Sequence, residues 1–174
     1  MKISQDLKKY SSGSFFRACY NVFLNTNFQI IFWYRAANFL YKKHMGAISK
    51  IIMYFHKLTF AVDIDYRAEI GPGFKIVHGL GIVIGKDCVI EDNVTIYQHV
   101  VLGGNKDKKK LIMGQERSQP YIHSGATLYA GCMVFGPVEI GEHSEIGAGT
   151  IVTKDVLPNS VAYNGKELIQ KEKS

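Results

Sequence analysis

The sequence has few of the features that would assign it to a special class of protein. It contains three cysteines, Cys19, Cys88 and Cys132, and no CxxC pair. So few cysteines, without a secretory signal, argue against a disulfide framework and predict a reducing, cytoplasmic environment. The sequence also lacks a run of about 18 uncharged apolar residues, which argues against a membrane-spanning helix.

Charge of one sign is present only in mild excess. The chain of 174 residues has a formal net charge of +6, with 47% hydrophobic and 21% charged residues. This composition is that of an ordinary globular domain, with at most a smaller appendage. The positive charge suits anionic small molecules or an anionic membrane surface. No zinc finger, basic zipper or RNA-binding signature is found, so no nucleic-acid partner is expected.

The first part of the chain, residues 1–61, has helical spacing of its apolar residues. From Ile48 to Leu58 they fall three or four positions apart and form one stripe along a helix. The preceding stretch, "FWYRAANFLYKK", is aromatic and basic. One interpretation is a helical cap that packs on the rest of the chain or on another subunit. The other is a helix in a membrane interface, which would bring a cytoplasmic protein to the inner membrane surface. The two are compatible.

The second part, residues 62–158, has a different period. Aliphatic residues recur every six positions, beginning with Ile64, Ile70 and Ile76. After a two-residue slip and again after a loop, the series continues with Ile84, Ile90, Ile96, Leu102, Ile122, Leu128, Val134, Ile140, Ile146 and Val152. A hexapeptide period is the signature of a parallel β-helix, in which three repeats form one coil. The sequence therefore predicts a mainly β protein, a parallel β-helix with a short N-terminal α-helical region.

Two further features follow from this repeat. The residue four places after each aliphatic residue should be small, because it lies beside the inner column. Cys88 and Cys132 occupy such positions, so we expect them to fill the core rather than to react. The loop from Gly103 to Tyr121 interrupts the repeat, and a loop of this length between regular coils commonly serves function. Residues 159–174 are predicted to form a C-terminal tail.

These motifs resemble a known family. The segment "IGPGFKIVHGLGIVIGKDCVIEDNVTIYQHVVLGG", with a following loop and "IGAGTIVTKDV", is similar to the serine acetyltransferase branch of the hexapeptide-repeat acyltransferases. The similarity runs from about Val62 to Pro158 and includes the slip and the loop. The short N-terminal region looks more like relatives in bacterial polysaccharide biosynthesis. The resemblance implies left-handed coils, a homotrimer that could pair into a dimer of trimers, and active sites between subunits. It also implies acetyl transfer from acetyl-coenzyme A to a hydroxyl group, with no metal.

Candidate catalytic residues follow from the resemblance. His78 lies in the slip and matches the family's catalytic histidine, and Asp63 matches the aspartate that partners it. A neutral imidazole can take the proton of a hydroxyl that attacks a thioester, and a carboxylate can fix the imidazole tautomer. Gly103 and Gly104 resemble the family's backbone N–H donors for the oxyanion.

Coenzyme A is expected along a groove over the later coils. Small residues there leave room for the pantetheine arm, and a lysine can pair with a phosphate. The positions that match the family are Ala130, Gly131, Gly147, Ala148, Gly149, Thr153 and Lys154.

The sequence departs from the family where an amino-acid substrate is recognised. Val77 stands in place of an aspartate suited to the ammonium group of serine, and Gln119 and Tyr121 replace a histidine and a lysine. Neutral hydrogen-bonding and aromatic groups suit a saccharide. We therefore predict an O-acetyltransferase acting on a sugar hydroxyl in capsule, O-antigen or exopolysaccharide biosynthesis. His99, 21 residues after His78, is a further candidate for acceptor binding.

Other functions stay open at this point. A serine O-acetyltransferase that tolerates the substitutions is one alternative, and a non-catalytic trimeric β-helix scaffold is another. Zinc held by His78, His99 and His123 is a third, but their spacing does not match the known metal enzymes of this fold.

Overall fold

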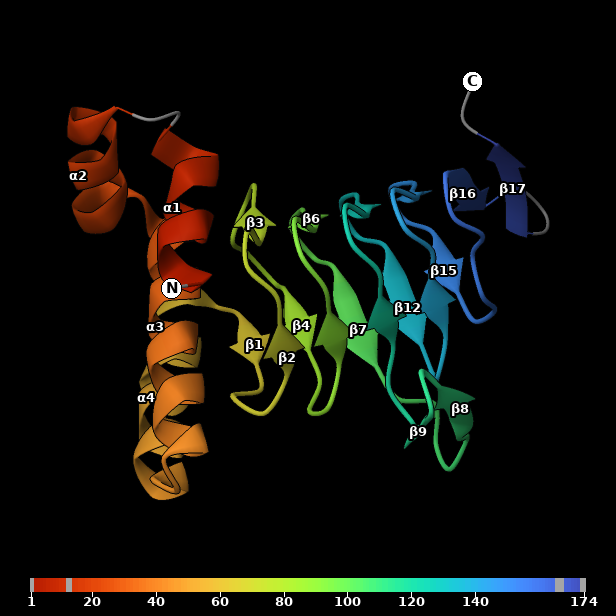
Figure 1. The fold of residues 1–174 in the computed structure, drawn as a ribbon, viewed down its shortest axis with the longest axis horizontal. Coiled ribbons are helices and arrows are strands. Elements are labelled where there is room, and N and C mark those ends of the chain that lie inside the picture. Colours follow the sequence, from red (N-terminus) through yellow and green to blue (C-terminus); the bar gives the residue numbers. More distant parts are fainter. Residues whose placement is uncertain (1, 12–13, 165–167, 173–174) are drawn as a thin grey trace.

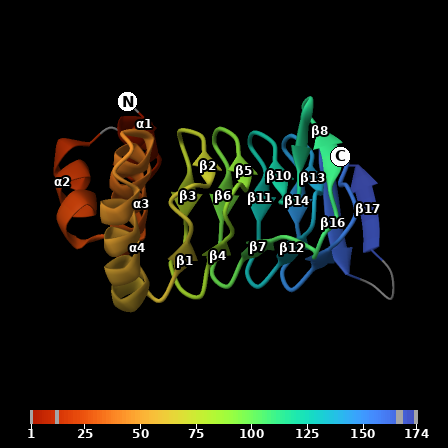
Figure 2. The same cartoon turned by 90° about the horizontal axis from the view of Figure 1, so that it is seen from below.

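The computed structural model describes residues 2–11, 14–164 and 168–172, with side chains as far as residue 164. Four helices are followed by stacked coils of short strands (Figure 1). The helices are α1 (Lys2–Ser11), α2 (Phe15–Leu24), α3 (Thr26–Lys42) and α4 (Gly46–Phe60). They cover one end of the stack, and the C-terminal strands lie at the other end (Figures 1 and 2).

The coils have three faces, each of which is a sheet of parallel strands. Face A contains β1 (Asp63–Ile64), β4 (Val83–Ile84), β7 (Val101–Gly103), β12 (Met133–Phe135) and β15 (Ile151–Val152). Face B contains β2 (Glu69–Ile70), β5 (Val89–Ile90), β10 (Tyr121–Ile122) and β13 (Glu139–Ile140). Face C contains β3 (Lys75–Ile76), β6 (Thr95–Ile96), β11 (Thr127–Leu128), β14 (Glu145–Ile146) and β16 (Ser160–Asn164), with β17 (Leu168–Glu172) antiparallel at its edge. The predicted parallel β-helix is confirmed.

The inner column consists of the aliphatic residues of the six-residue repeat. Each of them, from Ile64 to Val152, is buried. Cys88 and Cys132 are fully buried beside this column, as predicted, and burial raises the pKa of both thiols to about 12. These cysteines therefore serve packing, because a thiol with such a pKa forms little thiolate near neutral pH.

The slip in the repeat has a definite place in the coils. Asp63 pairs with Val83, twenty positions further on, whereas Val83 pairs with Val101, eighteen positions further on. The two additional residues of the first coil lie between β3 and β4, at the edge where face C turns into face A. This edge, which carries His78, is called edge CA below.

A buried ion pair joins the helical layer to the first coil. Arg35 of α3 contacts Asp6 of α1 at 2.9 Å, and the Asp6 side chain is fully buried. Arg35 also donates to the carbonyl oxygens of Ile70 and Gly71, while Asp6 accepts from the backbone N–H of Phe74. Because both charges are paired and hydrogen-bonded, the end of the coil is covered without an unpaired buried charge.

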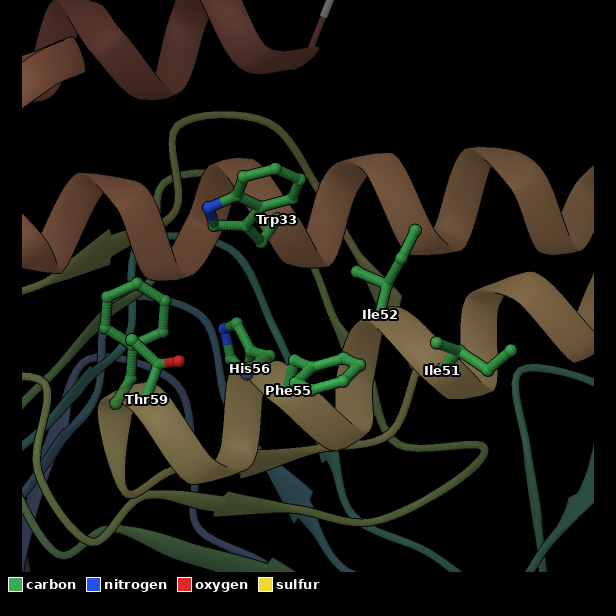
Figure 3. A pocket seen from close by; sticks show the side chains of 7 residues that line it. Trp33, Ile51, Ile52, Phe55, His56 and Thr59 are labelled. Atoms are coloured by element: carbon green, nitrogen blue, oxygen red, sulfur yellow. The ribbon is translucent and has the colours of Figure 1, made fainter.

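Helix α4 lies with its apolar stripe outward. Ile51, Phe55 and Leu58 are 58%, 60% and 65% exposed, whereas Ser49, Met53 and His56 are buried. His56 Nε2 donates to the carbonyl oxygen of Ile30 in α3. Figure 3 shows the pocket between the two helices, with Trp33 of α3 opposite His56 of α4. The stripe predicted from spacing is therefore not the side of α4 that packs on its own chain.

The two irregular segments of the sequence also form strands. Within the loop 103–121, β8 (Lys110–Ile112) and β9 (Gln115–Arg117) form an antiparallel hairpin. Lys110 bonds Glu139 and Asp155, and Ile112 packs on Val89 and Tyr121 of face B. The predicted tail after residue 158 contains β16, which pairs with β14 and continues face C. In the described part of the chain, no helix is long and apolar enough to cross a membrane.

Candidate active site

Edge CA is built from a column of tight turns stacked along the coils. Gly81, His99, Gly131 and Gly149 occupy equivalent positions and have φ angles of 64°, 58°, 70° and 67°. The N–H of each donates to a carbonyl oxygen one coil below. A column of mostly glycine at positive φ gives an edge with little side-chain bulk, where another molecule can approach the backbone closely.

His78 lies in the enlarged first turn of this edge, and its side chain is exposed. The side chain of Asn27, from the start of α3, holds the backbone on both sides of it. Asn27 Nδ2 donates to the carbonyl oxygen of Val77 at 2.8 Å, and Asn27 Oδ1 accepts from the N–H of Gly79 at 2.7 Å. A Cβ atom at Gly79 would overlap Ile30 of the same helix. The helical layer therefore fixes the turn that presents His78.

Aromatic rings continue from His78 along the edge. The ring centroid of His78 lies 6.4 Å from that of Tyr97, and Tyr97 lies 5.2 Å from Tyr129. Val77, Tyr97, Tyr129 and Gly147 directly follow successive strands of face C and are in register with one another. The edge thus offers an imidazole at one end, two tyrosine faces next to it and bare backbone beyond.

The structure brings His99 to the same edge, one coil beyond His78. Its ring covers Gly81, since a Cβ atom there would overlap His99 Nδ1. The same arrangement recurs at the edge between faces B and C, where His143 covers Gly125. Packing of a turn residue over a glycine therefore accounts for the conformation of His99, and its role in acceptor binding stays a prediction.

Asp63 lies on face A at the start of β1, next to edge CA. Its carboxylate contacts Lys57 Nζ of α4 at 2.5 Å, with both side chains more than half exposed. Among the described hydrogen bonds none joins Asp63 to His78. An exposed ion pair of this kind contributes little free energy. The Asp63 carboxylate can therefore leave Lys57 and bond another partner.

The candidate coenzyme A residues divide between two edges. Ala130, Gly131, Gly147, Ala148 and Gly149 lie at edge CA, beyond His78 and His99 along the coils. The other candidates lie where face A turns into face B, here called edge AB: Gly103, Gly104, Thr153 and Lys154. Within one chain, face A separates the oxyanion candidates from His78.

The two acceptor candidates from the loop point into their own chain. Tyr121 is 8% exposed, and its hydroxyl donates to Glu91 at 2.7 Å. Burial and this acceptor raise the pKa of Tyr121 to about 12. Gln119 lies against Gly85 and Gly104, and its Oε1 accepts from the Cys88 thiol. Within one chain, neither side chain lies at edge CA; Gln119 lies at the start of edge AB, next to Gly104.

Sequence reasoning missed three contributors to the site. Tyr97 and Tyr129 follow inward aliphatic residues of face C, so the repeat gave a signal for their outward direction but not for their proximity to His78. The contact of Asn27 with the His78 turn could not be predicted from the sequence. Asn27 lies 50 positions before Val77, in a helix outside the six-residue repeat. In the described part of the chain, no group of three His, Cys, Asp or Glu side chains could hold a metal ion.

Comparisons with known proteins point to one family. No protein-family model matches the chain. It is 36% identical over 145 residues to a serine acetyltransferase of Bacillus pumilus, which covers 82% of the chain and 64% of that protein. The chain therefore spans less than two thirds of this relative's length.

Solved structures agree with this similarity. A serine acetyltransferase in complex with CoA superposes with a TM-score of 0.83 at 26% identity, covering 98% of this chain and 68% of that one. Soybean serine acetyltransferase complexed with serine also gives a TM-score of 0.83, at 27% identity, covering 97% of this chain and 68% of that one.

The prediction of a sugar hydroxyl as acceptor is therefore wrong, and with it the role in polysaccharide biosynthesis. The similar proteins are serine acetyltransferases, and one of them is a complex with serine. The sugar prediction rested on Val77, Gln119 and Tyr121, and the role of Gln119 and Tyr121 in acceptor binding stays a prediction. Both are engaged inside their own chain.

Proposed function

We propose that this chain, which belongs to the hexapeptide-repeat acyltransferase superfamily, transfers the acetyl group of acetyl-coenzyme A to the hydroxyl group of serine. The observation that carries the proposal is the turn of His78. The imidazole is exposed at a glycine-rich edge, and the turn that carries it is clamped by Asn27. The similarity to serine acetyltransferases over most of the chain supports serine as the acceptor.

His78 acts as the general base in this proposal. Its neutral imidazole takes the proton of the serine hydroxyl while the oxygen attacks the thioester carbonyl carbon. The tetrahedral intermediate then collapses, the C–S bond breaks, and the leaving thiolate takes the proton back from the imidazolium. The products are O-acetylserine and coenzyme A. Asp63 orients the imidazole and stabilises its charged form once its carboxylate turns from Lys57 to His78.

A homotrimer with left-handed coils would complete the site. The outward residues of face A after Asp63 are apolar: Val83, Val101, Met133 and Ile151. On face C the outward residues are Lys75, Thr95, Thr127 and Glu145. Three copies that bury face A around a threefold axis would bring edge CA of one copy to edge AB of the next. Gly103 and Gly104 of one copy would then offer backbone N–H groups to the oxyanion formed beside His78 of its neighbour.

The same assembly gives coenzyme A a groove. The small residues Ala130, Gly131, Gly147, Ala148 and Gly149 would leave room for the pantetheine arm along edge CA, with the most open space at Gly149, where an added Cβ atom would meet nothing within 4 Å. Thr153 and Lys154, from edge AB of the adjacent copy, would meet its phosphates. Acetyl-coenzyme A supplies the activated acetyl group, and this chain's residues supply position, a base and hydrogen-bond donors.

The proposal is tested by mixing the purified chain with acetyl-coenzyme A and L-serine. Thiol release and O-acetylserine, identified by mass spectrometry, are followed together. We expect both products, and we expect His78→Ala to lower kcat by roughly 10² to 10⁴-fold. The matched control is His143→Ala, at the edge between faces B and C.

Two results would contradict the proposal. Thiol release that continues unchanged in His78→Ala would remove the imidazole from the mechanism. Binding of coenzyme A without acetylation of serine would favour a non-catalytic scaffold.

A further inference from the structure

Helix α2 carries an apolar surface that does not pack on its own chain. It is the outermost element at the helical end of the molecule, farthest from the C-terminal strands (Figures 1 and 2). Its only buried side chain is that of Asn21. Five large apolar side chains are 57% to 85% exposed and are called the α2 patch: Phe15, Phe16, Tyr20, Phe23 and Leu24. Phe32 and Phe39 of α3, in the same helical layer, are 43% and 61% exposed.

The charge of the chain is concentrated in the same helical layer. Residues 1–61 contain nine Lys and Arg residues and one acidic residue, Asp6, so their formal charge is +8. Residues 62–174 contain twelve basic and fourteen acidic residues, a formal charge of −2. Asp6 is fully buried in its pair with Arg35, so the exposed formal charge of the helical layer is entirely positive.

The α2 patch is separate from the apolar surface of face A. Helix α4, which carries the exposed apolar stripe, is followed directly by β1 of face A. Lys57 of α4 contacts Asp63 of β1. In Figure 2, α4 lies along the same side of the molecule as the strands of face A. The stripe therefore belongs with the surface assigned above to contacts between subunits. The α2 patch lies at the end of the coil axis, away from that surface.

We propose that the α2 patch docks on an anionic phospholipid surface. Helix α2 presents exposed aromatic residues and Arg17 within a basic helical layer, and aromatic residues combined with basic charge are typical of a surface that lies in a membrane interface. Anionic headgroups attract Lys and Arg from a layer of this charge, and the aromatic side chains enter the boundary between headgroups and acyl chains. Two weak signals, charge and apolar burial, then add to a stable association.

Charge also decides between lipid and a second copy of the chain. A symmetric contact through α2 would bring two like patches together, each in a layer with a formal charge of +8. Arg17, which is exposed in α2, would then face the partner's helical layer. Such a contact is opposed by repulsion, whereas an anionic membrane is favoured by the same charge. When the α2 patch docks in this way, the coils extend away from the bilayer. Edge CA and the proposed active site then lie beside the coils on the water side.

The test is co-sedimentation of the purified full chain with vesicles. One set contains phosphatidylcholine alone and the other contains about one third phosphatidylglycerol. We expect binding to the anionic vesicles only, and weaker binding when the salt concentration is raised from about 0.1 M to about 0.5 M. Phe16→Ser/Phe23→Ser should weaken binding by roughly tenfold or more, and Arg17→Gln by a smaller factor.

The matched control is Leu111→Ser/Met113→Ser on the β8–β9 hairpin. These side chains are 70% and 68% exposed, so both double variants remove similar exposed apolar surface. Equal loss of binding in both double variants, or no binding to anionic vesicles, would overturn the proposal. A change in oligomer size caused by Phe16→Ser/Phe23→Ser, without vesicle binding by the parent chain, would assign the patch to a protein contact. None of these readouts depends on acetyl transfer, so failure here leaves the proposed enzyme activity standing.

Discussion

At the scale of single residues, the position of His78 depends on a side chain from another part of the chain. Asn27 uses its donor and its acceptor on the two peptide groups that flank His78. No other side chain of the described structure bonds both of these groups. Asn27 is therefore a positioning residue, which acts on the reaction through His78.

We expect Asn27→Ala to lower kcat by roughly tenfold to a hundredfold, because a small displacement of the base costs heavily in rate. Steady-state kinetics with acetyl-coenzyme A and serine would measure this, with little change expected in KM for acetyl-coenzyme A. The control is Asn38→Ala, because Asn38 makes similar bonds to the Tyr66 and Ala68 carbonyl oxygens from the same helix. If both variants lose kcat to the same extent, the effect is general loss of stability.

Val77 is the residue that fits serine least well. Its apolar side chain stands beside His78, and it gives the ammonium group of serine no opposite charge. We expect Val77→Asp to lower KM for serine by roughly tenfold, since a charge-assisted hydrogen bond contributes about 1.5–3 kcal/mol. Val77→Asn, of similar shape without the charge, is the control. An unchanged KM in Val77→Asp would mean that the ammonium group binds elsewhere.

At the scale of elements, helix α4 shows that an apolar stripe does not always mark the buried side of a helix. Its apolar residues recur with helical period, as predicted, but His56 and Ser49 occupy the side that packs on α3. Ser49 donates to the Ala37 carbonyl oxygen and His56 to that of Ile30, so these polar groups are satisfied where they are buried. Helical spacing therefore predicted the helix but not which side would be covered by its own chain.

The burial of His56 predicts a pH dependence of stability. Burial lowers the pKa of His56, although the Ile30 carbonyl and the Asp63 charge act in the opposite direction. The unfolded chain therefore binds a proton at a higher pH than the folded chain does. Stability is fully present above the unfolded pKa of about 6.5 and is lost as the pH falls through the lower folded value.

Thermal unfolding between pH 7.5 and pH 5 would test this, with a Tm that decreases toward the acid end. His56→Gln should have a flatter profile, because it removes the titrating group from the packed side of α4. His44→Gln, at an exposed position, should keep the parent profile. A profile for His56→Gln as steep as that of the parent would assign the pH dependence to other groups.

At the scale of the whole molecule, one chain holds the parts of the proposed site at two separate edges. His78 and the glycine column lie at edge CA, while Gly103, Gly104 and Lys154 lie at edge AB. The apolar outward residues of face A lie between these edges. The proposed activity therefore depends on assembly as much as on any single side chain.

Ile151→Lys should separate the subunits. Ile151 is 51% exposed on face A, so the substitution adds a charge without disturbing the core of the chain. We expect a smaller particle by light scattering and a decrease in acetyl transfer of roughly a hundredfold, because the oxyanion donors are lost. Thr127→Lys, at an outward position of face C, should keep both size and activity. A trimeric Ile151→Lys with full activity would exclude face A as the subunit interface.

The coils and the residues that fill them could be predicted from the sequence pattern. The six-residue period, the buried aliphatic column, the buried cysteines and the slip at His78 are all local patterns, because each repeat contacts its neighbours in a fixed register. The remaining features depend on packing between segments that are far apart in the sequence. In the folded chain Tyr121 is buried on face B, Gln119 bonds the Cys88 thiol, the apolar stripe of α4 faces outward, and Asn27 reaches the His78 turn across 50 positions of sequence. These contacts join elements of different period, and their geometry follows only from how the helical layer sits on the first coil.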